Sequence, residues 1–127
     1  MSAQTLLSGG NKYYSYSGVL FGDVSAPATI QMIFIPNTGL KDSLIQVQPF
    51  FGQLISTSNN DGLGIEIKLD DNTIFQQQRL QGNIRSNQVE NPIQLFIPRQ
   101  SKLEIISMNT AGNNTQTRGC SLLGYYL

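Results

Sequence analysis

The 127-residue sequence contains no histidine, no tryptophan and one cysteine, and only 13% of its residues are charged. Without histidine, the chain lacks the usual base of serine and cysteine hydrolases and the commonest ligand of transition metals. A single cysteine excludes an intrachain disulfide. Cys120 lies in the apolar run 120–123, where we expect the thiol to be buried as a small hydrophobe. The sequence therefore predicts no catalytic triad, no zinc site and no cofactor.

An excess of positive charge is also missing. Lysine and arginine together number eight, as do aspartate and glutamate, and the basic residues are spread from Lys12 to Arg118. A neutral chain lacks the field that holds phosphate groups, so we expect no nucleic-acid partner. No run approaches the roughly 20 apolar residues of a membrane helix. Residues 1–11 hold no basic residue ahead of Leu6 and Leu7, so we expect no secretory signal, no membrane partner and a soluble protein made in a reducing compartment.

The apolar residues that are present recur with a period of two. Ile65, Ile67 and Leu69 alternate with polar residues, which is typical of a strand with one buried face. The run 70–72, Asp-Asp-Asn, then predicts a tight reversal into a second strand at 73–75, because Asp and Asn tolerate left-handed backbone.

The same pattern predicts eight strands and no helix. They cover residues 13–21, 29–35, 44–48, 65–69, 73–75, 93–97, 102–108 and 119–126. Eight short strands separated by turn-rich connections favour an all-β fold, an eight-stranded antiparallel β-sandwich of the jelly-roll kind. An immunoglobulin-like sandwich is the alternative, which the absence of tryptophan and of a cysteine pair weakens. We expect residues 12–127 to form this single domain and residues 1–11 to be a flexible arm.

Two segments resemble each other about half a chain length apart. Residues 30–36 and 93–98 are apolar runs that both end in Ile-Pro and are followed by a polar turn and a second strand. Proline has no backbone N–H and restricts the residue before it, so each run should end at an edge or corner of the sandwich. The repeat predicts two similar hairpin halves.

The acidic residues have two interpretations. Asp70 and Asp71 lie in the predicted turn, and Asp61 lies in the Gly-tipped run 59–62, so all three are typical of turn formers. Alternatively, the two loops could share a calcium ion at one end of the sandwich, although neither has the spacing of a known calcium motif. We expect unliganded turns and no metal.

Tyrosines mark both ends of the predicted domain. We take six residues as interface candidates, namely Tyr13, Tyr14, Tyr16, Tyr125, Tyr126 and Leu127. Tyrosine suits an interface because it combines a large apolar ring with a hydroxyl. The same rings could stack on sugars or pack at the sheet margins.

The C-terminal half resembles a known class of protein. Its Ile97-Pro98 turn, the strand 103–108, the Asn/Thr/Gly loop 109–117 and the closing strand ending in Gly-Tyr-Tyr look like small β-sandwich proteins of tailed-phage virions, which decorate capsids or build necks and fibres. The resemblance implies a non-enzymatic virion protein, made in the host cytoplasm. It would bind its own copies, as a trimer by analogy, and a major capsid or neck protein.

Two other functions remain open from the residues. A carbohydrate-binding sandwich would use tyrosine rings and amide side chains, with or without calcium. A small enzyme would need two carboxylates facing each other across a pocket.

Overall fold

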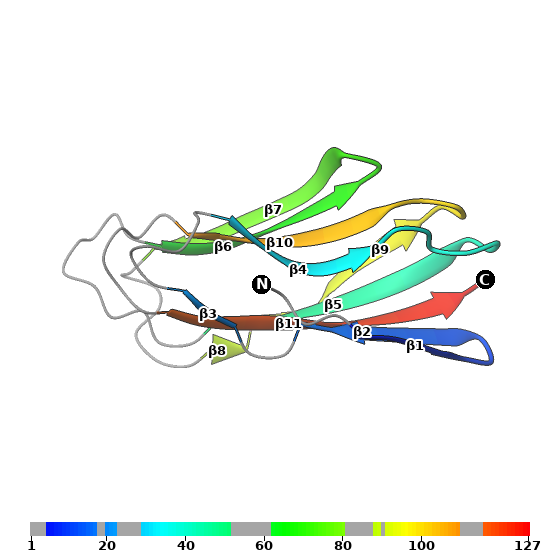
Figure 1. The fold of residues 1–127 in the computed structure, drawn as a ribbon, viewed down its shortest axis with the longest axis horizontal. Helices are drawn as coiled ribbons and strands as arrows, with labels where there is room; N and C mark the ends of the chain where they lie inside the picture. Colours follow the sequence, from blue (N-terminus) through cyan, green and yellow to red (C-terminus); the bar gives the residue numbers. More distant parts are fainter. Residues whose placement is uncertain are drawn as a thin grey trace.

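Eleven β-strands in two facing sheets form the regular structure of the part of the chain that the computed structural model describes (Figure 1). The described residues are 5–17, 20–22, 29–51, 62–80, 88–89, 91–109 and 116–127. The strands are β1 (Thr5–Gly9), β2 (Lys12–Tyr16), β3 (Leu20–Gly22), β4 (Thr29–Ile35), β5 (Ser43–Phe51), β6 (Gly62–Leu69), β7 (Asn72–Leu80), β8 (Gln88–Val89), β9 (Ile93–Ile97), β10 (Leu103–Asn109) and β11 (Gln116–Tyr126). Over these ranges the structure contains no helix that could cross a membrane.

The strand order is that of a jelly roll. One sheet runs β1-β2-β11-β5, with β3 also paired to β11 and with β8 and β9 both paired to β5; the other runs β4-β10-β6-β7. Every pair is antiparallel. The eight predicted strands correspond, in chain order, to β2 with β3, then β4, β5, β6, β7, β9, β10 and β11. Four of them lie in each sheet. In the larger sheet their order is first, eighth, third and sixth, and in the other it is second, seventh, fourth and fifth. This interleaving of the two ends of the chain confirms the jelly-roll sandwich rather than the immunoglobulin-like alternative.

All eight predicted strands are present, and the main correction concerns the N-terminal arm. Residues 5–9, expected to belong to a flexible arm, form β1 and pair with β2 from Thr5↔Tyr16 to Gly9↔Lys12. The two-residue turn between the strands has Gly10 at φ +62°, which hairpin turns of this length require and which glycine adopts without strain. Two short strands, β3 and β8, complete the larger sheet.

The space between the sheets is filled mainly by branched aliphatic side chains. Alternate residues of β5, β6 and β10 point inward, and Ile45, Val47, Ile65, Ile67 and Ile105 are at most 1% exposed. The β6–β7 hairpin forms as predicted. Its two turn residues, Asp70 and Asp71, have φ of 50° and 70°, the left-handed geometry of a two-residue turn.

The repeat predicted that each Ile-Pro segment would join two strands of a hairpin. This prediction is wrong. After Pro36 the chain crosses from the four-stranded sheet to β5 in the larger one, and after Pro98 it crosses back from β9 to β10. The strands flanking each connection therefore belong to opposite sheets instead of pairing side by side. β4 and β9 are both edge strands, as expected for runs that end in proline.

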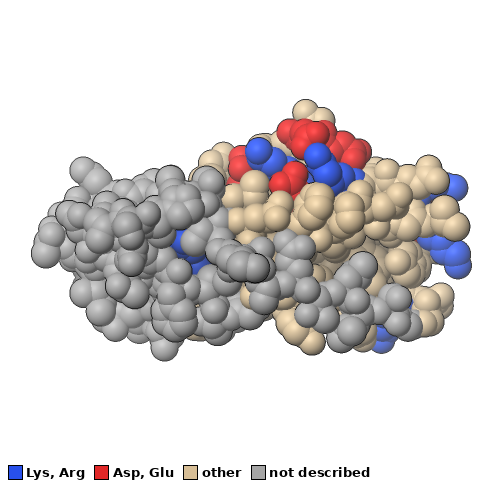
Figure 2. Space-filling model, in the orientation of Figure 1, with Lys and Arg blue, Asp and Glu red and all other residues tan. Residues whose placement is uncertain are grey.

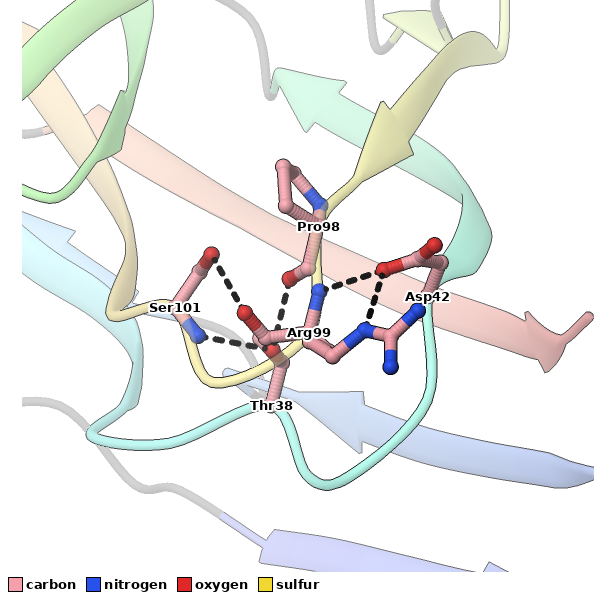
Figure 3. Close-up of polar contacts among 5 residues, drawn as sticks. All are labelled: Thr38, Asp42, Pro98, Arg99 and Ser101. Carbon is pink, nitrogen blue, oxygen red and sulfur yellow. Dashed lines mark hydrogen bonds and ion pairs between the residues drawn. The ribbon is translucent and has the colours of Figure 1, made fainter.

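The two crossings are hydrogen-bonded to each other at one end of the sandwich (Figure 3). The hydroxyl of Thr38 donates to the carbonyl oxygen of Pro98 over 3.1 Å and accepts from the backbone N–H of Ser101 over 3.1 Å. The backbone N–H of Thr38 donates to the carbonyl of Ser101, and that of Gln100 donates to Gly39. Because Thr38 and Ser101 are 3% and 2% exposed, these bonds satisfy polar groups that water does not reach.

Candidate functional site

The outward side of the larger sheet carries the candidate site. Side chains alternate along β2, β5, β9 and β11, so every second residue of these strands points away from the core. From this outward set we define the aromatic face, which consists of Lys12, Tyr14, Tyr16, Leu44, Gln46, Gln48, Gln94, Phe96, Ser121, Leu123 and Tyr125.

The pairing register orders this face into rows that run across the strands. One row is Lys12–Tyr125–Leu44–Phe96, the next is Tyr14–Leu123–Gln46–Gln94, and the third is Tyr16–Ser121–Gln48. Neighbours within a row are about 5 Å apart, and consecutive rows are separated by roughly 7 Å. The rows therefore form a continuous surface in which apolar rings lie beside amides.

Large apolar side chains are unusually exposed on this face. Phe96 is 53% exposed, Leu44 and Tyr16 are 47% exposed, Tyr14 is 40% and Tyr125 is 39%. Among the described residues of the face, Lys12 is the single charged side chain, and its Nζ lies 5.4 Å from the centre of the Tyr125 ring, in cation–π range.

The opposite side of the sandwich is charged. Figure 2 shows acidic and basic side chains gathered over the four-stranded sheet. They contact one another: Lys102 Nζ lies 2.5 Å from Asp71 Oδ1 and 3.9 Å from Glu104 Oε1, and Glu66 accepts a hydrogen bond from Thr73. The bond to Asp71 raises the pKa of Lys102. This face has the composition of a solvated surface, and the aromatic face does not.

A shallow groove of about 210 Å³ lies within the aromatic face. It is lined by Leu44, Ile45 and Gln46 of β5, Gln94 of β9 and Tyr125 of β11. Gln46 and Gln94 are directly opposite in the β5–β9 ladder, and within the described residues neither side chain has a hydrogen-bond partner. Two amides with free donors and acceptors thus stand beside an aromatic ring.

The six predicted interface residues are divided by the structure. Tyr14, Tyr16 and Tyr125 lie on the aromatic face, and Leu127, at 65% exposure, lies just beyond the end of β11. Tyr126 is half-buried against the core.

Tyr13 is a core residue and not an interface residue. It is 2% exposed, its hydroxyl is hydrogen-bonded to Ser43 Oγ at 2.8 Å, and its ring centre lies 5.0 Å from that of Tyr126. Burial raises the pKa of the Tyr13 hydroxyl. The prediction failed because neighbouring residues of a strand point to opposite faces of the sheet. Composition alone did not indicate which of the tyrosines in β2 would point toward the core.

Eight residues of the face were missed by the sequence analysis, namely Lys12, Leu44, Gln46, Gln48, Gln94, Phe96, Ser121 and Leu123. The signal was present in part, since Leu44, Gln46 and Gln48 alternate with buried Ile45 and Val47. Nothing local indicated that β5 would lie between β9 and β11.

The residues of the alternative calcium site are described in part. Gly62 begins β6 and Asp70 follows its other end, so these two residues are separated by the length of an eight-residue strand, roughly 25 Å. Asp70 accepts a hydrogen bond from the backbone of Lys102, as a turn former should. Residues 59–61 lie outside the described part of the chain. No cluster of three potential metal ligands occurs among the residues that are described.

β11 also carries two buried ionisable groups. Cys120 is 6% exposed, as predicted, and burial raises the pKa of its thiol to about 12. Arg118, two residues earlier, is fully buried, and desolvation lowers its pKa. The high thiol pKa makes Cys120 a packing residue, because the reactive thiolate is not populated at neutral pH.

Comparisons with known proteins identify the fold alone. No protein-family model matches the chain, and no curated protein matches it in sequence. Among solved structures, the chain is similar to part of dimeric latent PorU from Porphyromonas gingivalis, with a TM-score of 0.51 and 11% identity over 99% of this chain and 14% of that one.

Two structures of infectious bursal disease virus are also similar. The Gt strain gives a TM-score of 0.48 and 15% identity over 98% of this chain and 33% of that one. The VP2 subviral particle gives a TM-score of 0.45 and 17% identity over 85% of this chain and 32% of that one. The chain therefore spans 14% to 33% of the length of the proteins it matches, and the likeness concerns the β-sandwich.

Proposed function

We propose that the protein is a non-enzymatic structural subunit of a virion, of the type that decorates or cements a capsid, and that it acts by surface complementarity. Jelly rolls occur in viral capsid domains and in lectins, so the fold is compatible with this function without deciding it. The assignment to tailed phages, and to a major capsid or neck protein as partner, follows the resemblance of the C-terminal half.

The contrast between the two sides of the sandwich carries the proposal. One side is charged and internally paired, whereas the aromatic face exposes Tyr14, Tyr16, Leu44, Phe96 and Tyr125 with one charge among them. Tyrosine is enriched at protein interfaces and among the few residues that carry most of their binding energy, and charged residues are depleted at interface centres. Contiguous exposed apolar side chains on a sheet support a role in contact with another protein.

The same surface suits contact with further copies of the chain. The net charge is zero, so copies repel one another weakly. The face is the outward side of a sheet, and a standard interface needs about 800 Å² from each partner. We propose a homo-oligomer, with a trimer as the first state to test.

The test measures the mass of the protein in solution by light scattering. We expect an oligomer for the unchanged protein and a lower mass for the double variant Tyr14→Ser/Tyr16→Ser, because it removes two exposed rings without touching the core. Ile74→Ser is the matched control. Ile74 is 40% exposed, as Tyr14 is, but belongs to β7 of the other sheet, so its replacement should leave the mass unchanged.

Two results would contradict the proposal. One is a monomer at high micromolar concentration that also fails to bind particles. The other is an oligomer whose mass responds to Ile74→Ser and not to the tyrosine variant, since contact would then involve the charged side.

A further inference from the structure

We infer that the groove between β5, β9 and β11 binds one ring of a neutral saccharide. This function goes beyond the proposed structural role. The groove shares Leu44 and Tyr125 with the proposed contact surface, and its amides, Gln46 and Gln94, are distinct from the exposed apolar side chains named there. The inference rests on the size of the groove, on the pairing of its amides and on its charge.

The size of the groove limits its occupant to about one ring. Its volume of about 210 Å³ lies below the roughly 300–1,000 Å³ of pockets for drug-sized ligands. Its two walls are consecutive rows of the sheet, with Leu44 and Tyr125 on one and Gln46 and Gln94 on the other. Rows of this kind are separated by roughly 7 Å.

The chemistry of the walls matches a polyhydroxylated ring. Each glutamine offers a carbonyl acceptor and an NH₂ donor, and a sugar hydroxyl both donates and accepts. Because Gln46 and Gln94 are directly opposite, their amides reach adjacent hydroxyls on one edge of a ring. Tyr125 presents an aromatic surface, 39% exposed, on which the C–H face of a sugar can pack.

The charge of the groove favours a neutral ligand. None of its five lining residues is ionisable in the neutral pH range, and the ammonium group of Lys12 lies over the Tyr125 ring. An acidic sugar would need a free cation among the lining residues, and a basic ligand would need a carboxylate.

An extended peptide fits the site less well. Peptides bind sheets mainly by pairing their backbone with an exposed edge. This groove crosses β5, whose neighbours on both sides, β9 and β11, already occupy its backbone groups. A ligand there meets side chains only.

The experiment uses saturation-transfer NMR and titration with the methyl glycosides of glucose, galactose, mannose and N-acetylglucosamine. We expect at least one to bind with millimolar affinity that does not change with salt. The double variant Gln46→Ala/Gln94→Ala should weaken binding roughly tenfold, since it removes two sets of hydrogen bonds. Tyr16→Ser, on the same face but outside the groove, should bind as the unchanged protein does.

Three outcomes would overturn the inference. The first is that no glycoside binds, either to the unchanged protein or to Tyr14→Ser/Tyr16→Ser. The second is that the glutamine double variant binds a glycoside as tightly as the unchanged protein does. The third is that sialic acid or a blocked tetra-alanine peptide binds and that the glutamine double variant abolishes this binding. The oligomeric mass of the glutamine variant is measured by light scattering in the same experiment. Loss of sugar binding and loss of assembly are therefore separate results.

Discussion

Gly124 of β11 stands directly opposite Tyr13 of β2, and the Tyr13 ring occupies the space that a side chain at position 124 would need. A Cβ atom at that position would lie 2.2 Å from Cζ of Tyr13, well inside contact distance. The ring thus packs directly over the glycine, and its hydroxyl reaches past β11 to Ser43 of β5 in the same sheet. This close approach turns Tyr13 inward and its neighbours Lys12 and Tyr14 outward.

We expect Gly124→Ala to lower the free energy of unfolding by about 3 kcal/mol, because the ring of Tyr13 has no room to move within the core. Chemical denaturation of four proteins gives the test: unchanged, Gly124→Ala, Tyr13→Leu and the double variant. The double variant should lose less than the sum of the two single changes, since leucine frees the space that alanine needs. Strict additivity would show that the two residues do not compete for the same volume.

The contact between the two crossings predicts a second stability effect. Thr38→Val keeps the shape of the side chain but leaves the Pro98 carbonyl and the Ser101 N–H without their partner, at a cost of about 1–3 kcal/mol. Thr38→Ser keeps the hydroxyl and should cost less than half as much. Equal thermal melts for the two variants would show that the hydroxyl does not join the crossings.

The alternation along β6 predicts opposite results for adjacent residues. Ile67 is fully buried, so Ile67→Asp places an unpaired carboxylate in the core and should prevent soluble folding, since its cost is comparable to a total stability of about 5–15 kcal/mol. Lys68→Ala should be close to neutral because Lys68 lies on the outward side. Soluble expression and thermal melts of both variants make the comparison. A folded Ile67→Asp protein would be incompatible with this register.

The burial of Cys120 predicts slow thiol chemistry. Its pKa of about 12 and 6% exposure mean that a thiol reagent should label it in denaturant and hardly at all in the native protein. Cys120→Ser should destabilise the fold by about 1–3 kcal/mol, because a hydroxyl replaces a packed sulfur. Rapid labelling under native conditions would mean that this part of β11 opens readily.

Asp42 gives a prediction about acid stability. It accepts hydrogen bonds from the backbone N–H and from Nε of Arg99, at 2.9 and 3.3 Å, and the backbone bond is the main cause of its lowered pKa (Figure 3). A carboxyl group whose pKa is lower in the folded state stabilises the fold above its unfolded pKa, near 3.8, and loses this effect as the pH falls through the folded value. Asp42→Asn should therefore lower the melting temperature at neutral pH, with a difference that shrinks below about pH 4. A difference that stays constant with pH would show that the charge of Asp42 is not involved.

Several features of the fold follow from short stretches of sequence. The alternation of Ile65, Ile67 and Leu69 predicts β6 and its buried side, and Asp70-Asp71 predicts the left-handed turn that follows. Cys120 is buried as its apolar neighbours indicate. These features are local, because strand periodicity and turn geometry depend on residues a few positions apart.

The candidate site was decided by tertiary structure. Leu44, Gln94 and Tyr125 are far apart in sequence and meet only because β5 pairs with β9 on one side and β11 on the other. Likewise, the two Ile-Pro segments look like hairpins in sequence, and only the sheet order makes them crossings. The amino-acid pattern by itself determines which residues of a strand share a side. Which strands become neighbours, and which side meets the core, depends on long-range packing such as that of Tyr13 against Gly124.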